Sequence, residues 1–61
     1  MNKKFSQMES KLIADYLRGK GLDIQSAVMF WRMTAQFAAR VIQERFGLTV
    51  TETELLKAAG R

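Results

Sequence analysis

The sequence predicts a small all-α domain of three helices, and three observations carry this prediction. The chain has 61 residues, enough for one domain, of which 48% are hydrophobic, and it contains neither Pro nor Cys. Its apolar residues recur at spacings of three and four, as on the face of a helix. Capping residues and glycines divide the chain into three such stretches. We expect helices at about residues 7–18, 24–46 and 52–59 in one domain spanning 1–61, with residues 1–5 as a flexible basic tail.

The first helix has a clear start and a clear end. Ser6 and Glu9 stand in the S-x-x-E arrangement of a capping box, in which each side chain binds a backbone N–H that the helix leaves unpaired. Gly19 and Gly21 suit the left-handed conformation that ends many helices. Apolar residues at helical spacing along one side predict the face that packs on the core: Met8, Leu12, Ile13, Tyr16 and Leu17.

The middle helix is the most informative element of the sequence. Asp23, or else Ser26, is a good N-cap and Gly47 suits the helix end, so the helix would extend over about 23 residues and about 34 Å. It carries two apolar stripes, the first formed by Ile24, Val28, Trp31, Ala35, Ala38 and Ile42, and the second by Phe30, Met33, Phe37 and Val41. The remaining polar strip is narrow, which indicates a helix buried over most of its circumference.

Two short neighbouring helices cannot cover both stripes of so long a helix. We therefore expect a homodimer in which the two long helices pack antiparallel, because exposed apolar patches of this size mark association sites. Two alternatives remain open, a compact monomeric bundle in which both stripes are core and a groove that binds another protein. The interface candidates are Phe30, Trp31, Met33, Phe37 and Val41.

The third helix starts at a second capping box, formed by Thr51 and Glu54, with Val50 and Leu55 as its hydrophobic staple. Residues 46–55 resemble the turn of a helix-turn-helix unit: an apolar residue, a glycine, an apolar residue and a hydroxyl-rich helix start.

The resemblance to a helix-turn-helix unit is partial. Such units usually place alanine where this chain has Gln43 and a β-branched apolar residue where it has Thr53. The helix that would meet DNA opens with Glu52 and Glu54, and a duplex would repel their carboxylates.

The net charge of +4 makes nucleic acid an alternative partner. Half of the basic residues have a structural explanation, because they lie at or just past predicted helix C-termini, where the helix dipole stabilises a cation. The remaining candidates for a nucleic-acid surface are Lys3, Lys4, Arg32 and Arg40.

The composition argues against catalysis. Without His or Cys, the usual general bases, thiolate nucleophiles and transition-metal ligands are missing, and we expect no cofactor and no metal. No apolar stretch is long enough for a membrane span, and nothing resembles a signal peptide, so we expect a cytoplasmic protein.

These observations lead to one leading function and one alternative. We expect a small regulatory or adaptor protein, of a size that bacteria and their phages encode, which self-associates and binds a larger protein through its helices. The alternative is a small basic DNA- or RNA-binding regulator that uses the helix-turn-helix-like segment.

Overall fold

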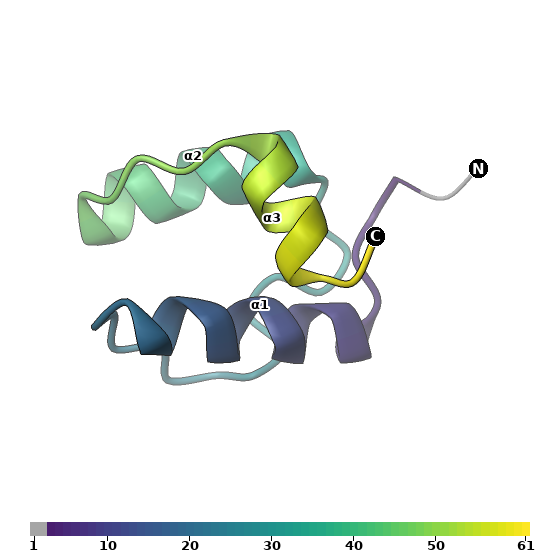
Figure 1. Ribbon diagram of the computed structural model, residues 1–61, viewed down its shortest axis with the longest axis horizontal. Coiled ribbons are helices and arrows are strands. Elements are labelled where there is room, and N and C mark those ends of the chain that lie inside the picture. Colours follow the sequence, from purple (N-terminus) through teal and green to yellow (C-terminus); the bar gives the residue numbers. More distant parts are fainter. Residues whose placement is uncertain (1–2) are drawn as a thin grey trace.

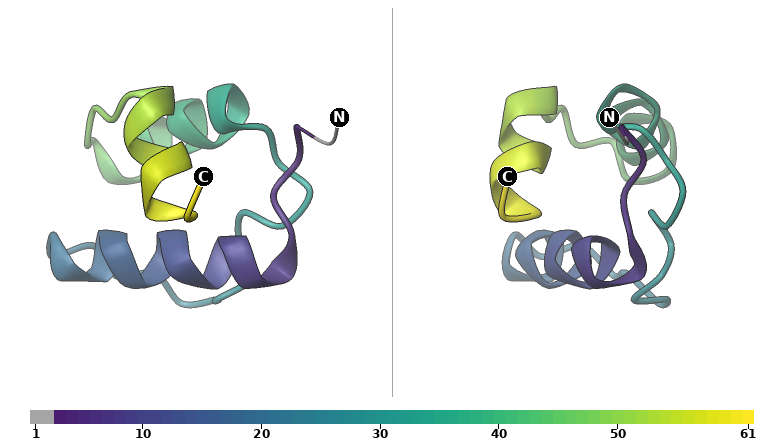
Figure 2. Two further views of the ribbon diagram at one scale, coloured as in Figure 1. Left: turned by 45° about the vertical axis from the view of Figure 1, so that its right-hand side comes forward. Right: turned by 90° about the vertical axis from the view of Figure 1, so that its right-hand side faces the viewer.

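The computed structural model, which describes residues 3–61, contains three helices: α1 (Gln7–Gly19), α2 (Ala35–Phe46) and α3 (Glu52–Ala58). α1 and α2 lie on opposite sides of the molecule, and α3 packs against both (Figure 1). Residues 3–6 and the long connection between α1 and α2 lie across from α3 (Figure 2). The prediction of a small three-helix all-α domain is confirmed.

α1 begins at the predicted capping box. The Ser6 N–H donates to Glu9 Oε1 (2.8 Å), and the Glu9 N–H donates to Ser6 Oγ (3.1 Å). The face of α1 that packs on the core differs from the predicted one. Ile13 and Leu17 are buried together with Ser10 and Ala14, and Tyr16 packs partly buried against the core. Met8 and Leu12, by contrast, are exposed.

The predicted middle helix at residues 24–46 is wrong in its N-terminal half, because α2 begins only at Ala35. Thr34 is its N-cap, with an extended backbone and a side chain that accepts a hydrogen bond from the Phe37 N–H (3.1 Å). In a continuous helix Phe30 would lie about 120° away from the stripe through Ile24 and Ile42. Breaking the helix allows Phe30 and Ile24 to enter one core, and each buried side chain contributes about 1.5–3 kcal/mol.

The connection of residues 20–34 is fastened to α1 by side chains. The buried Ser10 Oγ donates to the Ala27 carbonyl (2.8 Å) and accepts from the Phe30 N–H (2.9 Å). The Arg18 guanidinium donates twice to the Ile24 carbonyl, at 3.0 and 2.8 Å. The connection therefore buries Ile24 and Phe30 within one chain, whereas Val28, Trp31 and Phe37 stay exposed.

The expectation of a flexible tail at residues 1–5 is wrong for Lys4 and Phe5, and Met1 and Asn2 lie outside the described residues. Phe5 is buried, and it exchanges backbone hydrogen bonds with the connection. Its N–H donates to the Met33 carbonyl (2.8 Å), and its carbonyl accepts from the Arg32 N–H (2.8 Å). Lys4 forms an isolated antiparallel bridge with Thr34.

The turn between α2 and α3 follows the predicted chemistry. Gly47 has φ 72°, a left-handed conformation that glycine adopts without a steric penalty, and its N–H donates to the Gln43 carbonyl. Thr51 caps α3, and its side chain accepts from the Glu54 N–H (3.0 Å), which is one half of the predicted capping box. The other half is absent, because the Glu54 carboxylate accepts from the Tyr16 hydroxyl of α1. Val50 and Leu55 are both buried, as expected of the hydrophobic staple. None of the helices in residues 3–61 is long and apolar enough to cross a membrane.

Candidate binding groove between α2 and α3

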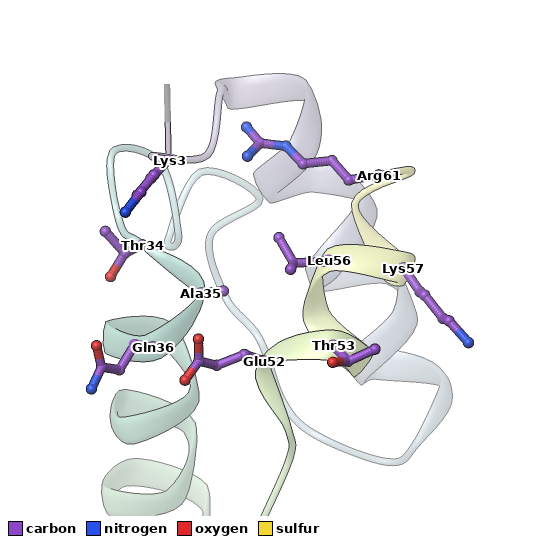
Figure 3. A pocket seen from close by; sticks show the side chains of 9 residues that line it. All are labelled: Lys3, Thr34, Ala35, Gln36, Glu52, Thr53, Leu56, Lys57 and Arg61. Carbon is purple, nitrogen blue, oxygen red and sulfur yellow. The ribbon is translucent and has the colours of Figure 1, made fainter. Parts of the chain in front are cut away.

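A groove with a volume of about 630 Å³ lies between the N-terminal turn of α2 and the outer face of α3. We call it the α2–α3 groove (Figure 3). The residues that line it are Lys3, Thr34, Ala35, Gln36, Glu52, Thr53, Leu56, Lys57 and Arg61. Its volume falls within the range of pockets that take small ligands or a few side chains of a partner.

The middle of the groove is apolar. Ala35 on α2 and Leu56 on α3 both point into it and face each other (Figure 3). Thr34 lies beside Ala35 at the start of α2, and Gln36 and Thr53 line the outer sides of the two helices. α2 has no acidic residue in its first turn, and the carboxylate beside its N-terminal N–H groups comes from Glu52 of α3, which reaches across the groove toward α2 (Figure 3). The groove can thus hold an apolar side chain and bind neighbouring polar groups.

Cations gather at one end of the groove. Lys3 and Arg61 lie on opposite sides of the end near the chain termini, whereas Glu52 lies farther along and Lys57 points away from the groove (Figure 3). The Arg61 guanidinium donates to both Glu9 carboxylate oxygens, at 2.5 and 2.9 Å. Because Arg61 donates these hydrogen bonds, it lowers the pKa of Glu9 to about 2, with help from the Ser6 N–H.

A backbone turn places Arg61 at this end. Gly60 has φ 87°, and the Arg61 N–H reaches back to the Leu56 carbonyl (2.9 Å), which closes the end of α3. The Arg61 guanidinium also donates to the Lys4 carbonyl (3.2 Å) and lies 5.6 Å from the centre of the Phe5 ring. The two ends of the described chain therefore meet at the groove.

A second hollow continues from the groove around the start of α2. It is lined by Thr34, Gln36, Phe37 and Arg40, and it shares the first two residues with the groove. The Phe37 side chain is 52% exposed at its rim. Arg40 forms a surface ion pair with Glu44 at 3.5 Å. The second hollow, which adjoins the apolar groove, is therefore bordered by the exposed ring of Phe37 and by the cation of Arg40.

Glu54, one of the two acidic residues that argue against DNA binding by α3, directs its carboxylate toward α1. Glu54 accepts a hydrogen bond from the Tyr16 hydroxyl of α1 and lies 3.6 Å from Lys20 Nζ. The Tyr16 hydrogen bond and the Lys20 charge lower the pKa of Glu54. Only Glu52 of the pair lines the groove.

Trp31 and Arg32 form a separate exposed site on the connection. Trp31 is 43% exposed, and the Arg32 guanidinium lies 5.4 Å from the centre of its ring. Arg32 has φ 68°, in the left-handed region that side chains other than glycine rarely adopt. Its N–H is held by the Phe5 carbonyl, so the backbone that carries this ring and cation is anchored.

The candidates chosen from the sequence separate into different environments. Phe30 is fully buried, so it is unavailable to a partner, and Met33 and Val41 are half-buried. Phe37 and Trp31 are exposed. Phe37 lines the hollow at the start of α2, and Trp31 lies on the connection against Arg32.

The basic candidates are also divided. Lys3 lines the groove, Arg40 lines the adjoining hollow, Lys4 pairs with Thr34 at the groove's edge, and Arg32 lies against Trp31. Sequence reasoning missed Ala35 and Leu56 as binding residues, because only the packing of α3 on α2 brings them together.

The described residues contain no group of three or more acidic side chains placed to hold a metal ion. Comparison with protein-family models, with curated proteins and with solved structures finds no match to this chain.

Proposed function

We propose that this chain is a small non-enzymatic regulatory or adaptor protein that binds a larger protein through the α2–α3 groove. The observation that carries the proposal is the apolar middle of the groove, Ala35 and Leu56, beside the exposed ring of Phe37. Apolar pockets with a rim of polar groups are the usual form of helix-binding and peptide-binding sites. The proposal includes a cytoplasmic location for the protein and a bacterial or phage origin.

The charges around the groove favour an acidic partner segment. Lys3 lies at one end of the groove, where Arg61 is paired with Glu9, and Arg40 lies at the adjoining hollow, where it is paired with Glu44. Glu52 is the one carboxylate among the residues that line the groove. The whole chain carries a net charge of +4. An amphipathic segment that places a large apolar side chain over Leu56 and carboxylates toward Lys3 would match this arrangement.

A direct test titrates two unlabelled peptides into isotope-labelled protein and maps the chemical-shift changes of the protein by NMR. One is an amphipathic peptide with Leu, Phe and Glu, and the other has Lys in place of each Glu. We expect the acidic peptide to shift the resonances of Thr34–Phe37 and Thr53–Leu56, and the basic peptide to leave them unchanged. Shifts that cluster on another face, or equal responses to both peptides, would refute the proposed site.

A matched pair of variants extends this test to the natural partner. Leu56→Gln removes apolar surface from the groove, and Leu12→Gln makes the same change on the outer face of α1. A partner captured from host lysate and then titrated against purified protein should lose affinity for Leu56→Gln and keep it for Leu12→Gln. Thermal unfolding of both variants establishes that each is folded at the temperature of the assay.

A nucleic-acid-binding function is the second candidate, favoured by the α2–turn–α3 unit with Glu54 turned toward α1. The test is binding to duplex DNA or RNA between about 50 and 200 mM salt, over which a protein with several phosphate contacts loses orders of magnitude in affinity. Lys3→Ala and Arg40→Ala should then weaken binding more than the control Arg45→Ala, which changes a cation outside both hollows. Absence of binding at 50 mM salt removes this candidate.

A further inference from the structure

The face of α1 directed away from the core carries two large apolar side chains. Met8 is 67% exposed and Leu12 is 40% exposed, and they lie one helical turn apart. The opposite face holds the buried residues of the helix, so this outer face makes no contribution to the core. Figure 2 shows α2 and α3 on one side of α1, which leaves the helix along an edge of the molecule.

Two opposite charges follow one edge of this apolar face. Lys11 and Asp15 lie one turn apart, with Nζ and Oδ2 separated by 3.9 Å, and Asp15 also pairs with Arg18 at 3.1 Å. At 100° per residue, Lys11 and Asp15 lie on the same side of the line through Met8 and Leu12. The pattern along this edge is therefore a cation followed by an anion in the direction of the chain.

We propose that the outer face of α1 binds a second copy of this chain, with the two α1 helices antiparallel about a twofold axis. Such an axis brings the same edge of both helices together and reverses the chain direction. With the axis near residue 13, Lys11 of each copy faces Asp15 of the other, while Leu12 packs at the centre. In a parallel pair the twofold axis would run along the helices and place these two edges on opposite sides of the contact, so Lys11 and Asp15 of the two copies would not meet. This self-complementarity selects a second copy over an unrelated partner.

The contact is small, and the dimer is therefore weak. α1 has 13 residues and is about 20 Å long, which limits the area that two such helices bury to the lower range of protein interfaces. This dimer replaces the one expected from the sequence, which needed a long middle helix. The inference does not rest on the proposed function, because it uses a different face and leaves the α2–α3 groove open.

Analytical ultracentrifugation of the full chain between about 10 μM and 1 mM tests the proposal, since small interfaces give weak, concentration-dependent association. We expect the average mass of the wild type to rise toward that of a dimer. Leu12→Gln should remain monomeric throughout, and Leu56→Gln should dimerise like the wild type. A wild type that stays monomeric at 1 mM, or dimerisation unaffected by Leu12→Gln, overturns the proposal.

Charge reversal at Lys11 and Asp15 provides a second test, whose outcome depends on the antiparallel arrangement of the two α1 helices. Lys11→Asp places two carboxylates opposite each other, and Asp15→Lys places two ammonium groups opposite each other. Each single variant should weaken dimerisation at least about threefold, an effect of the size of one surface ion pair, and the double variant Lys11→Asp/Asp15→Lys should restore it. Failure of the double variant to recover rules out the antiparallel pairing.

Discussion

The backbone N–H of Phe30 donates a hydrogen bond to the side-chain hydroxyl of Ser10, 20 residues earlier in the chain, across 2.9 Å. Both residues are fully buried. The same hydroxyl donates to the Ala27 carbonyl, so one small side chain satisfies two backbone groups of a segment that has no helix or sheet partner there. This contact fastens the connection to α1 and places the Phe30 ring in the core.

Ser10→Ala removes a single hydroxyl group, but it should lower the free energy of unfolding markedly. It leaves the Phe30 N–H buried without an acceptor, which costs about 1–3 kcal/mol. In a domain of this size each kcal/mol lowers the melting temperature by about 4–8 °C. Urea and thermal unfolding measure the effect, with the exposed Ser26→Ala as the matched control. A Ser10→Ala protein as stable as the control would show that this contact does not hold the connection.

Thr34→Ala distinguishes the observed start of α2 from the continuous helix that the sequence predicted. At an N-cap, loss of the Thr34 side chain costs about 0.5–2 kcal/mol, and Thr34→Ser should retain most of that stability. In the interior of a helix the same change would raise stability, because alanine has the higher helix propensity. The sign of the change in urea-unfolding free energy decides between the two structures.

Arg32→Gly should leave the free energy of unfolding within about 0.5 kcal/mol of the wild type, although glycine usually destabilises a folded chain. Glycine relieves the cost of φ 68°, about 1–2 kcal/mol, and this offsets both its greater freedom in the unfolded state and the lost contact with Trp31. Arg40→Gly, within α2, should lower stability by about 1 kcal/mol. Equal losses for the two variants would indicate that residue 32 is helical.

The ion pair at the end of the groove predicts a specific dependence of stability on pH. The folded pKa of Glu9, about 2, lies below its ordinary value of 4.5, so its contribution is complete above about pH 5 and is lost as the pH falls toward 2. Glu9→Gln keeps the capping geometry and removes only the charge. We expect the wild type to be more stable than Glu9→Gln at pH 7 and equal to it near pH 2. A difference that is constant with pH would exclude the Arg61 interaction as its source.

Local sequence signals correctly predicted the start of α1, the end of α2 and the start of α3, but not the start of α2. The capping box at Ser6 and Glu9, the turn glycine Gly47 and the cap at Thr51 are all found where the sequence indicated. Each of these features is decided by residues within one helical turn of one another. Their interpretation needed no knowledge of the rest of the chain.

The break before α2 depends on contacts that no local pattern contains. The spacing of Ile24, Val28, Trp31 and Ala35 continues the rhythm of α2 without interruption, and Asp23 is as good an N-cap as Thr34. The decisive contacts join the connection to Ser10 and Phe5, which are distant in sequence.

The candidate site was predictable only in part for the same reason. Phe37, Lys3 and Arg40 could be chosen by residue type, and all three lie at the α2–α3 groove or its adjoining hollow. Leu56 and Ala35 have no individual signal. They form the middle of the groove only because α3 packs beside the first turn of α2.

The start of α2 at Ala35 is the claim on which the α2–α3 groove depends, because a continuous helix would change the wall of the groove formed by Thr34 and Ala35 and would move Phe30 out of the core. NMR carbon chemical shifts and amide exchange measure it directly. We expect helical shifts from Ala35 to Phe46, non-helical shifts at residues 22–33, and a slowly exchanging amide at Phe30. Uninterrupted helical shifts from residue 24 to residue 46 would contradict the account.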